Sequence, residues 1–299
     1  MQEQTITALR ESLAAAGLPF VQDEPLAGHT TFKIGGPAAF WCTPHNAEEL
    51  RSTLALCREN GARVYLLGNG SNTLFDDAGF DGAVIDMRGV AEMEHSDADN
   101  DVVRITAGAG QTLGRLCSKA QALGLTGLEF ACGIPGTVGG AVYMNAGAYG
   151  GEIKDVLASV RYLTGEGEIV EAPAEQLDLR YRHSIFEENG GCILSAKFYL
   201  ARGSASDIRA KMDDLMARRR DKQPFKRPVG AFAAALIDQC GLRGYRHGGA
   251  AVSEKHCGFV VNLGGATCAD VLALCDEVRA IVKEKTGYDL EKEIRVVAA

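Results

Sequence analysis

The segment GIPGTVGGAVYMNAGAYGG, from Gly133 to Gly151, contains seven glycines among mostly small side chains. Glycine loses more backbone freedom on folding than any other residue, so ordering such a segment is costly. Long loops inside compact domains are uncommon, and those that occur are usually functional. The segment therefore favours a backbone that lies against a large flat or polyanionic ligand, and a plain connector is the less favoured interpretation.

A shorter glycine turn, LGNGSN, follows the apolar strand that VYLLG predicts over residues 64–68. Successive N–H groups in such a turn can form a concave anion site. The turn is not a dinucleotide fingerprint, because the residues after it predict a turn and a strand instead of a helix. It is not a P-loop either, since no G-K-S/T follows. Alone, the pattern is equally typical of an ordinary glycine turn.

The composition bounds the class of protein. With 299 residues, 46% hydrophobic and 23% charged, the chain resembles soluble globular proteins and suits one large or two ordinary domains. A net charge of -8 argues against non-specific nucleic-acid binding. There is no run of eighteen apolar residues, and residues 1–20 predict an amphipathic helix without the features of a secretory signal. We expect a cytoplasmic protein that binds neither nucleic acid nor membranes.

Cysteine and histidine usage gives no sign of a metal site. The nine cysteines contain no C-x-x-C pair, which predicts reduced, mostly buried thiols. His183, His247 and His256 have no metal-ligand spacing, and we interpret them as structural or solvated residues.

Periodicity and end signals predict mixed helices and strands. Asn46 with Glu49 marks the start of one helix, and Thr112 caps another. A Gly-Gly-Pro turn indicates a strand pair over residues 30–44. Helices are predicted over 1–20, 46–61, 113–124, 206–220, about 234–239 and 269–287, and further strands over 64–68, 79–87, 101–110, 156–164, 167–172, 191–200, 257–262 and 290–297.

This order predicts an α+β fold. There is no repeat and no low-complexity linker, so the elements should form α+β subdomains packed together. We expect two small α/β subdomains over about 19–90 and 91–201, and a C-terminal α+β domain over 202–299, with the boundary in the small polar segment ARGSAS.

Several motifs resemble one known family. These are L-G-N-G-S-N, G-I-P-G-T-V-G-G-A-V-Y-M-N-A-G-A-Y-G, Y-R-H-S-I-F, V-S-E-K-H-C-G-F-V-V-N and L-E-K-E-I. In this order, from about residue 25 to residue 297, they are similar to the bacterial UDP-N-acetylenolpyruvoylglucosamine reductases, also called UDP-N-acetylmuramate dehydrogenases. The FAD domain of that family is of the vanillyl-alcohol-oxidase type.

The resemblance implies a non-covalent FAD in domain 1–201, a substrate-binding domain over 202–299, and NADPH as the reductant. Hydride would pass from the flavin to the β-carbon of an enolpyruvyl sugar nucleotide. No obligate protein partner is expected. The residues implied for FAD are Gly68, Asn69, Gly70, Ser71, Asn72, Gly133, Gly136, Thr137, Gly139 and Gly140.

The same resemblance assigns residues to the reaction. Arg182 matches the family's catalytic arginine, a permanent cation for the substrate carboxylate and the developing enolate. Glu293 matches the catalytic glutamate, and Tyr181 and Lys222 match positions near the nucleotide. Without the resemblance, Arg182 and Glu293 would be interpreted as ordinary surface charges.

One family motif is incomplete. The family has K-x-P, then a loop with P-S-A-G-S-x-F whose second serine is the general acid, then K-x-P again. Here Lys222 and Pro224 are followed directly by Phe225, Lys226 and Pro228. The loop is either omitted from the sequence, deleted, or naturally absent, and a Cα separation of about 3.8 Å between Pro224 and Phe225 would exclude an omission. A flavin-binding protein with little turnover is therefore the alternative function.

Overall fold

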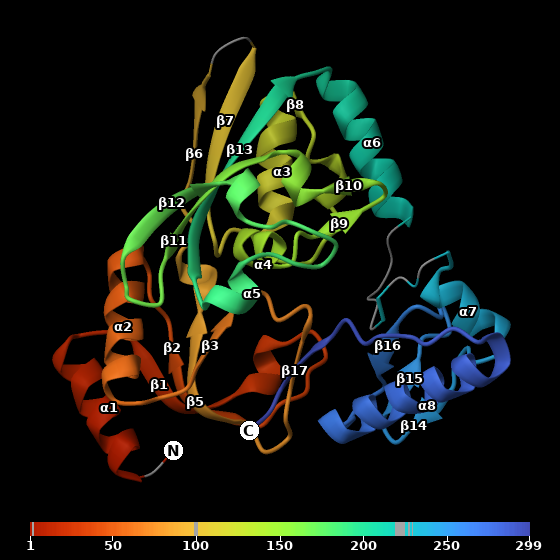
Figure 1. Cartoon of the computed structure of the whole chain (residues 1–299), viewed down its shortest axis with the longest axis horizontal. Helices are drawn as coiled ribbons and strands as arrows, with labels where there is room; N and C mark the ends of the chain where they lie inside the picture. The colour runs from red at the N-terminus through yellow and green to blue at the C-terminus, as the bar shows by residue number, and fades with distance from the viewer. Residues whose placement is uncertain (2, 99–100, 219–224, 227, 229) are drawn as a thin grey trace. The chain divides into compact units, whose positions relative to one another are not determined.

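The computed structural model describes residues 1, 3–98, 101–218, 225, 226, 228 and 230–299 (Figure 1). The chain forms two compact units, each assembled from separate stretches. Unit 1 comprises Met1–Gln22, Phe40–Asn69 and Gly82–Arg219, and unit 2 comprises Asp23–Ala39, Gly70–Asp81 and Arg220–Ala299. The boundary at residue 202 and the two N-terminal subdomains stay predictions. The sequence analysis did not anticipate that two segments before residue 82 belong with the C-terminal third.

The α+β fold is confirmed by the order of the elements. The N-terminal part forms a four-stranded sheet in the order β1-β2-β5-β3, with β3 parallel to β5. The chain passes between the units within β1, β2 and β5. Its elements are α1 (Glu3–Ala15), β1 (Phe20–Pro25), η1 (Leu26–His29), β2 (Pro37–Cys42), α2 (Ala47–Glu59), β3 (Val64–Leu67), β4 (Thr73–Phe75), β5 (Phe80–Asp86) and η2 (Met87–Gly89).

Helix α2 begins where its cap predicts. The side chain of Asn46 accepts hydrogen bonds from the N–H groups of Glu48 and Glu49, which have no partner inside the helix. Leu50 and Cys57 are buried, whereas Leu54 is only half-buried. Helix α2 therefore packs on the core through the face that carries Leu50 and Cys57.

The predicted strand pair over residues 30–44 is wrong in its first half. The hydroxyl of Thr30 donates to the carbonyl oxygen of Ile34 at 3.2 Å, and Lys33 has a φ of 55°, which no strand accommodates. This turn removes residues 30–36 from the sheet. Strand β2 pairs instead with β1, where the sequence analysis predicted no strand.

A second sheet lies in unit 1, with β13 in its middle. Its order is β12-β11-β13-β7-β6, with β8 also paired to β13, and its strand pairs are antiparallel. Figure 1 shows α3, α4 and α6 beside this sheet, and α4 contacts both β13 and β7. The elements are β6 (Met93–Asp97), β7 (Val102–Gly108), α3 (Leu113–Ala122), β8 (Leu125–Thr126), η3 (Glu129–Ala131), α4 (Val138–Tyr143), β9 (Gly147–Ala148), β10 (Gly151–Glu152), η4 (Ile153–Asp155), β11 (Leu157–Leu163), β12 (Ile169–Pro173), η5 (Ala174–Gln176), α5 (Phe186–Asn189), β13 (Cys192–Arg202) and α6 (Ala205–Arg218).

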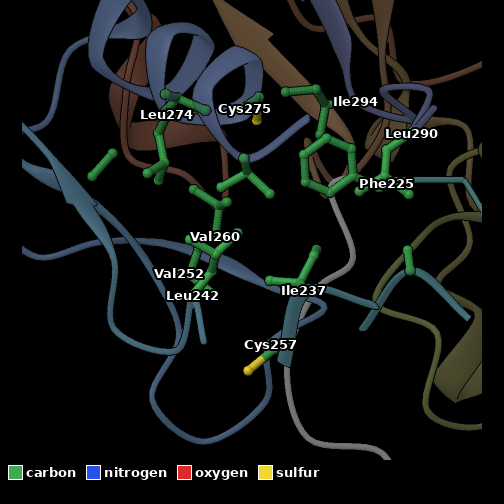
Figure 2. Packing of buried hydrophobic residues seen from close by; sticks show 14 of the residues in the cluster. Phe225, Ile237, Leu242, Val252, Cys257, Val260, Leu274, Cys275, Leu290 and Ile294 are labelled. Atoms are coloured by element: carbon green, nitrogen blue, oxygen red, sulfur yellow. The ribbon is translucent and has the colours of Figure 1, made fainter. Parts of the chain in front are cut away.

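The core of unit 2 is an apolar cluster under helix α8 (Cys268–Thr286), as Figure 2 shows. Thr267 and Asp270 form a capping box at the start of α8, and Gly287 ends the helix in the left-handed conformation. Phe225 is 2% exposed and belongs to this cluster, together with Leu290 and Ile294. The remaining elements are α7 (Ala233–Gln239), β14 (Arg246–His247), β15 (Ala250–Val252), β16 (Val260–Asn262) and β17 (Arg295–Val297).

The prediction of mostly buried thiols is confirmed. Eight of the nine cysteines are buried, and Cys132 is half-buried. Burial raises the pKa of Cys42 and of Cys57 to about 12, which keeps both thiols protonated at neutral pH. Over the described ranges, no helix is long and apolar enough to cross a membrane.

Candidate active site

Within unit 1, the turn after β3 contacts the glycine-rich segment. The side-chain amide of Asn69 donates to the carbonyl oxygen of Pro135 at 3.0 Å. A Cβ atom on Gly68 would collide with the hydroxyl oxygen of Thr137. Gly68 is therefore required for the close approach of two segments that lie more than sixty residues apart. These are the two segments that the resemblance implies for one FAD.

Thr137 starts the short helix α4, and the N–H groups around it have different partners. Its side chain accepts from the N–H of Gly140 at 3.5 Å. The N–H of Val138 donates to Gln111, and that of Gly139 donates to Ala109, each at 2.8 Å. The candidate cofactor residues Gly139 and Gly140 thus have their N–H groups directed to protein oxygens.

Two neighbouring N–H groups remain for a ligand. Among the described residues, the N–H groups of Gly136 and Thr137 have no acceptor. Backbone donors that precede a helix, next to a turn that only glycine allows, fit a phosphate group. The residues present therefore fit the pyrophosphate of FAD, with Gly136 and Thr137 as donors. For Gly133, the described residues show no hydrogen bond that bears on its predicted role in FAD binding.

The second half of the same turn belongs to unit 2. Gly70 has a φ of 58°, and its carbonyl oxygen accepts both the N–H and the hydroxyl of Thr31 at 3.1 Å. The side-chain amide of Asn72 donates to the carbonyl oxygen of Glu293 at 3.1 Å. The carbonyl oxygen of Asn72 accepts the N–H of Arg295 at 3.0 Å. Ser71 lies between these residues and is half-buried.

Glu293 lies two residues before β17, which pairs in parallel with β4, and Arg295 is opposite Thr73. Strand β4 directly follows the glycine turn. Unit 2 therefore holds the predicted catalytic glutamate against the last residue of the predicted cofactor turn. Glu293 is half-buried.

Arg182 lies at the tip of a tight turn in unit 1. The N–H of Arg180 donates to His183, and the N–H of His183 donates back to Arg180. Arg182 itself has a φ of 55°, an uncommon conformation for a long side chain. Its guanidinium lies over the ring of Tyr181, 5.3 Å from the centroid, and makes a long contact of 3.5 Å with the carbonyl oxygen of Gly147. Tyr181 is 48% exposed.

A carboxylate lies near this turn and interacts with the charge of Arg182. The ammonium of Lys154 lies 2.9 Å from Glu152. The hydrogen bond from Lys154 lowers the pKa of Glu152, and the side chain of Asn145 and the charge of Arg182 lower this pKa further. Glu152 is therefore a stable anion near Arg182.

The histidines bond within the protein. His183 contacts Glu187 and Asp178, and His247 contacts Glu277 at 2.8 Å. His256 packs on Phe259 and accepts the N–H of Gly258. Across the described part of the chain there is no cluster of three metal-binding side chains.

Lys222 and Pro224 lie outside the described residues, so the peptide link at Pro224 is not defined here. On the other side of that link, Phe225 is buried and the N–H of Lys226 donates to the carbonyl oxygen of Glu291 at 2.9 Å. The chain is thus firmly attached at the point where the family loop would end.

The chain is similar to known proteins over almost all of its length. Residues 38–173 match the FAD binding domain family, and residues 223–297 match the C-terminal domain family of UDP-N-acetylenolpyruvoylglucosamine reductase. The UDP-N-acetylenolpyruvoylglucosamine reductase of Lachnoclostridium phytofermentans is 48% identical over 284 residues, which cover 92% of each chain. The chain belongs to the UDP-N-acetylenolpyruvoylglucosamine reductases. It is thus an oxidoreductase with an FAD-binding domain, and the resemblance seen in the sequence is confirmed.

Two further members of this reductase family support the assignment. The Agathobacter rectalis enzyme is 45% identical over 315 residues, covering 99% of both chains. That alignment is longer than the 299 residues here, so the relative carries residues that this chain lacks. The crystal structure of the Thermus caldophilus reductase superposes with a TM-score of 0.77 at 34% identity, covering 93% of this chain and 98% of that one.

The sequence analysis of this reductase missed several residues near Arg182. Asn145 is 1% exposed and donates to the backbone of the turn at Arg180. Ser184 is fully buried and donates from the turn to the backbone of Tyr143. One sequence signal for Asn145 was available, since asparagine before Ala-Gly is typical of a turn and asparagine tolerates left-handed conformations. Ser184 and Glu152 have no comparable local signal.

Proposed function

We propose that this protein reduces UDP-N-acetylglucosamine enolpyruvate to UDP-N-acetylmuramate in peptidoglycan precursor synthesis, with NADPH as the reductant. The observation that carries the proposal is the double role of one segment, Gly133–Gly151. Its first part contacts the turn at Gly68 and Asn69, and its second part contacts Arg182 through Gly147. The same segment therefore contacts both the turn whose backbone fits a phosphate group and the cation Arg182.

The cofactor is expected to be a non-covalent FAD. The residues Gly68, Asn69, Gly70, Ser71 and Asn72 form the turn that would lie against its pyrophosphate, with donors from Gly136 and Thr137. Gly133, Gly139 and Gly140 would contribute by close approach of their backbone. Bound FAD supplies the hydride that the enolpyruvyl group receives.

The reacting groups of the chain have distinct roles. Arg182 would bind the substrate carboxylate and stabilise the negative charge that develops next to it, because a guanidinium is charged at every working pH. Glu293 would assist in handling the proton that the adjacent carbon receives. Tyr181 and Lys222 would contact the nucleotide part of the substrate.

The direct test is anaerobic spectroscopy of the purified protein. NADPH should bleach the yellow flavin, and UDP-N-acetylglucosamine enolpyruvate should restore its colour. The protein without added reductant provides the baseline. Colour that NADPH removes and the substrate never restores would contradict the reductase function, and a colourless protein that takes up no added FAD would contradict the cofactor assignment.

A second candidate is a flavin-binding protein with little turnover. It is favoured by the direct sequence Pro224-Phe225, where the family's general-acid serine loop is missing. FAD binding should survive this loss because the glycine segments lie elsewhere in the chain. Normal bleaching by NADPH followed by very slow reoxidation by the substrate would identify this candidate.

A cytoplasmic location and the absence of obligate protein partners accompany the proposal. The nucleotide substrate supports the location, and the net charge of -8 supports the expectation that nucleic acid is not a ligand. Gel filtration of the purified protein with a nucleic-acid digest control tests both partner expectations.

A further inference from the structure

Asn145 has an unusual environment for a polar side chain. It is 1% exposed, and its backbone is left-handed with a φ of 41°. A buried amide costs free energy unless its donors and acceptor are paired. The donors and the acceptor of its side chain are paired here, which indicates a defined structural role.

The hydrogen bonds of Asn145 connect three segments of unit 1. The amide nitrogen donates to a carboxylate oxygen of Glu152 at 2.9 Å and to the carbonyl oxygen of Arg180 at 3.1 Å. The side-chain oxygen accepts the N–H of Lys154 at 3.0 Å. One side chain thereby joins the end of the glycine-rich segment to the turn that carries Arg182.

The turn is anchored again on its other side. The hydroxyl of Ser184 donates to the carbonyl oxygen of Tyr143 at 2.5 Å, and this serine is fully buried. Arg182 therefore lies between two attachments to the segment Tyr143–Asn145. A residue with a φ of 55° needs such support, because the surrounding structure must outweigh the strain of its backbone.

We propose that Asn145 is a positioning residue for Arg182, and that its amide sets the preference of the protein for a ligand that carries the enolpyruvyl carboxylate. The inference rests on the proposed role of Arg182. It adds that the orientation of the guanidinium is determined by the bond from Asn145 to the carbonyl of Arg180. It also adds that Glu152 is held beside Arg182 but does not itself bind the ligand.

Asn145→Asp is the sharpest variant. It keeps the size and the acceptor for Lys154, but it removes both donated bonds and brings a second carboxylate to Glu152. The extra negative charge should attract the Arg182 guanidinium away from a bound carboxylate. Asn145→Gly is the second variant, because glycine adopts the left-handed conformation without strain and adds no charge.

The measurement is equilibrium binding, which does not require turnover. The perturbation of the FAD absorbance gives dissociation constants for UDP-N-acetylglucosamine enolpyruvate and for UDP-N-acetylglucosamine, which lacks the carboxylate. We expect both Asn145 variants to reduce the preference for the enolpyruvyl ligand by about tenfold, the scale of one hydrogen bond to a charged group. Affinity for UDP-N-acetylglucosamine and FAD content should stay unchanged.

Two matched variants separate the possible failures. Asn60→Asp makes the same substitution in unit 1, and it also removes a bond to a backbone carbonyl, that of Leu56 at 2.8 Å. The ligand preference of this control variant should stay normal. Arg182→Ala should abolish the preference. If Arg182→Ala retains it, the proposed role of Arg182 fails and the inference fails with it. If Arg182→Ala loses it while both Asn145 variants keep it, only the positioning role of Asn145 is overturned.

Discussion

The side-chain amide of Asn72 and the backbone of Glu293 are joined directly, with 3.1 Å between Nδ2 and the carbonyl oxygen. The carbonyl oxygen of Asn72 also accepts the N–H of Arg295, two residues further on. Asn72 therefore fixes the chain at Glu293 and again two residues after it. A residue that the resemblance implies for the cofactor has a second role in unit 2, which is to hold the predicted catalytic glutamate.

Asn72→Ala should slow the reduction of the enolpyruvyl substrate by about tenfold and lower the free energy of unfolding by about 1 kcal/mol, because the Glu293 carbonyl loses its donor. The check is steady-state kinetics together with FAD content and thermal unfolding. Asn60→Ala is the control, since it loses a comparable bond far along the chain from Glu293. Loss of FAD with normal kinetics of the reconstituted protein would show that cofactor contact is the main role of Asn72.

Gly68→Ala should strongly reduce FAD binding. The new Cβ atom would collide with the hydroxyl of Thr137, so the turn would have to separate from the glycine-rich segment. We expect at least a tenfold loss of FAD affinity, measured by titration of the apoprotein. Gly114→Ala is the matched control, because nothing lies within 4 Å of its Cβ position in α3 and alanine favours a helix by about 1 kcal/mol. Equal FAD affinity in both variants would contradict the fit proposed for this turn.

Much of the fold could be predicted because its signals are local. Asn46 and Thr112 mark the starts of α2 and α3 through side-chain bonds within three residues. Residues 30–36 could not be predicted, because their strand propensity is overridden by the Thr30 turn and by burial of Phe32 and Ile34 in the core of unit 2.

Long-range pairing explains other misses. Strands β4 and β17 have three residues each, too few for an alternating pattern, and their pairing joins Thr73 to Arg295. No local rule indicates such a contact. Arg182 and Glu293 were predicted as catalytic residues only through family motifs, since half-exposed charges have no distinguishing local pattern. The left-handed backbone of Arg182 and its support from Asn145 could be recognised only in the structure.

Glu152→Gln should change how stability depends on pH. The pKa of Glu152 is lowered in the folded state, mainly by Lys154, so its charge stabilises the fold above the ordinary carboxyl pKa, and this contribution is lost as the pH falls through the lowered value. The partly exposed pair with Lys154 should contribute less than about 1 kcal/mol. Urea unfolding from neutral pH to about pH 3 measures the difference between wild type and variant, which should shrink below about pH 4.3. A difference that grows in acid would exclude this carboxylate as a stabilising anion.

Cys132 should react with iodoacetamide before the other cysteines. It is the half-buried member of the nine, whereas burial raises the pKa of Cys192 and Cys275 to about 12 and suppresses their reactive thiolate. Mass spectrometry after brief alkylation of the folded protein should find one main modified peptide. Alkylation in denaturant, where all nine should react, is the control. Uniform labelling of the folded protein would contradict the described core.

Restoring the missing loop tests the origin of any weak turnover. An insert with the family pattern P-S-A-G-S-x between Pro224 and Phe225 supplies the serine that would protonate the reduced substrate. Because general acids contribute roughly 100- to 10,000-fold, we expect substrate-driven reoxidation of the flavin to accelerate on that scale, with the rate of bleaching by NADPH unchanged.

Phe225 and Lys226 are anchored in unit 2, so the insert adds residues before a fixed attachment point and should leave that core intact. The control insert has alanine in place of its second serine, so it restores the loop length without the acid. If both inserts accelerate reoxidation equally, loop length and not proton donation limits the reaction. If neither does while the protein without an insert turns over rapidly, this chain protonates its product through another group, and Glu293 becomes the first residue to test.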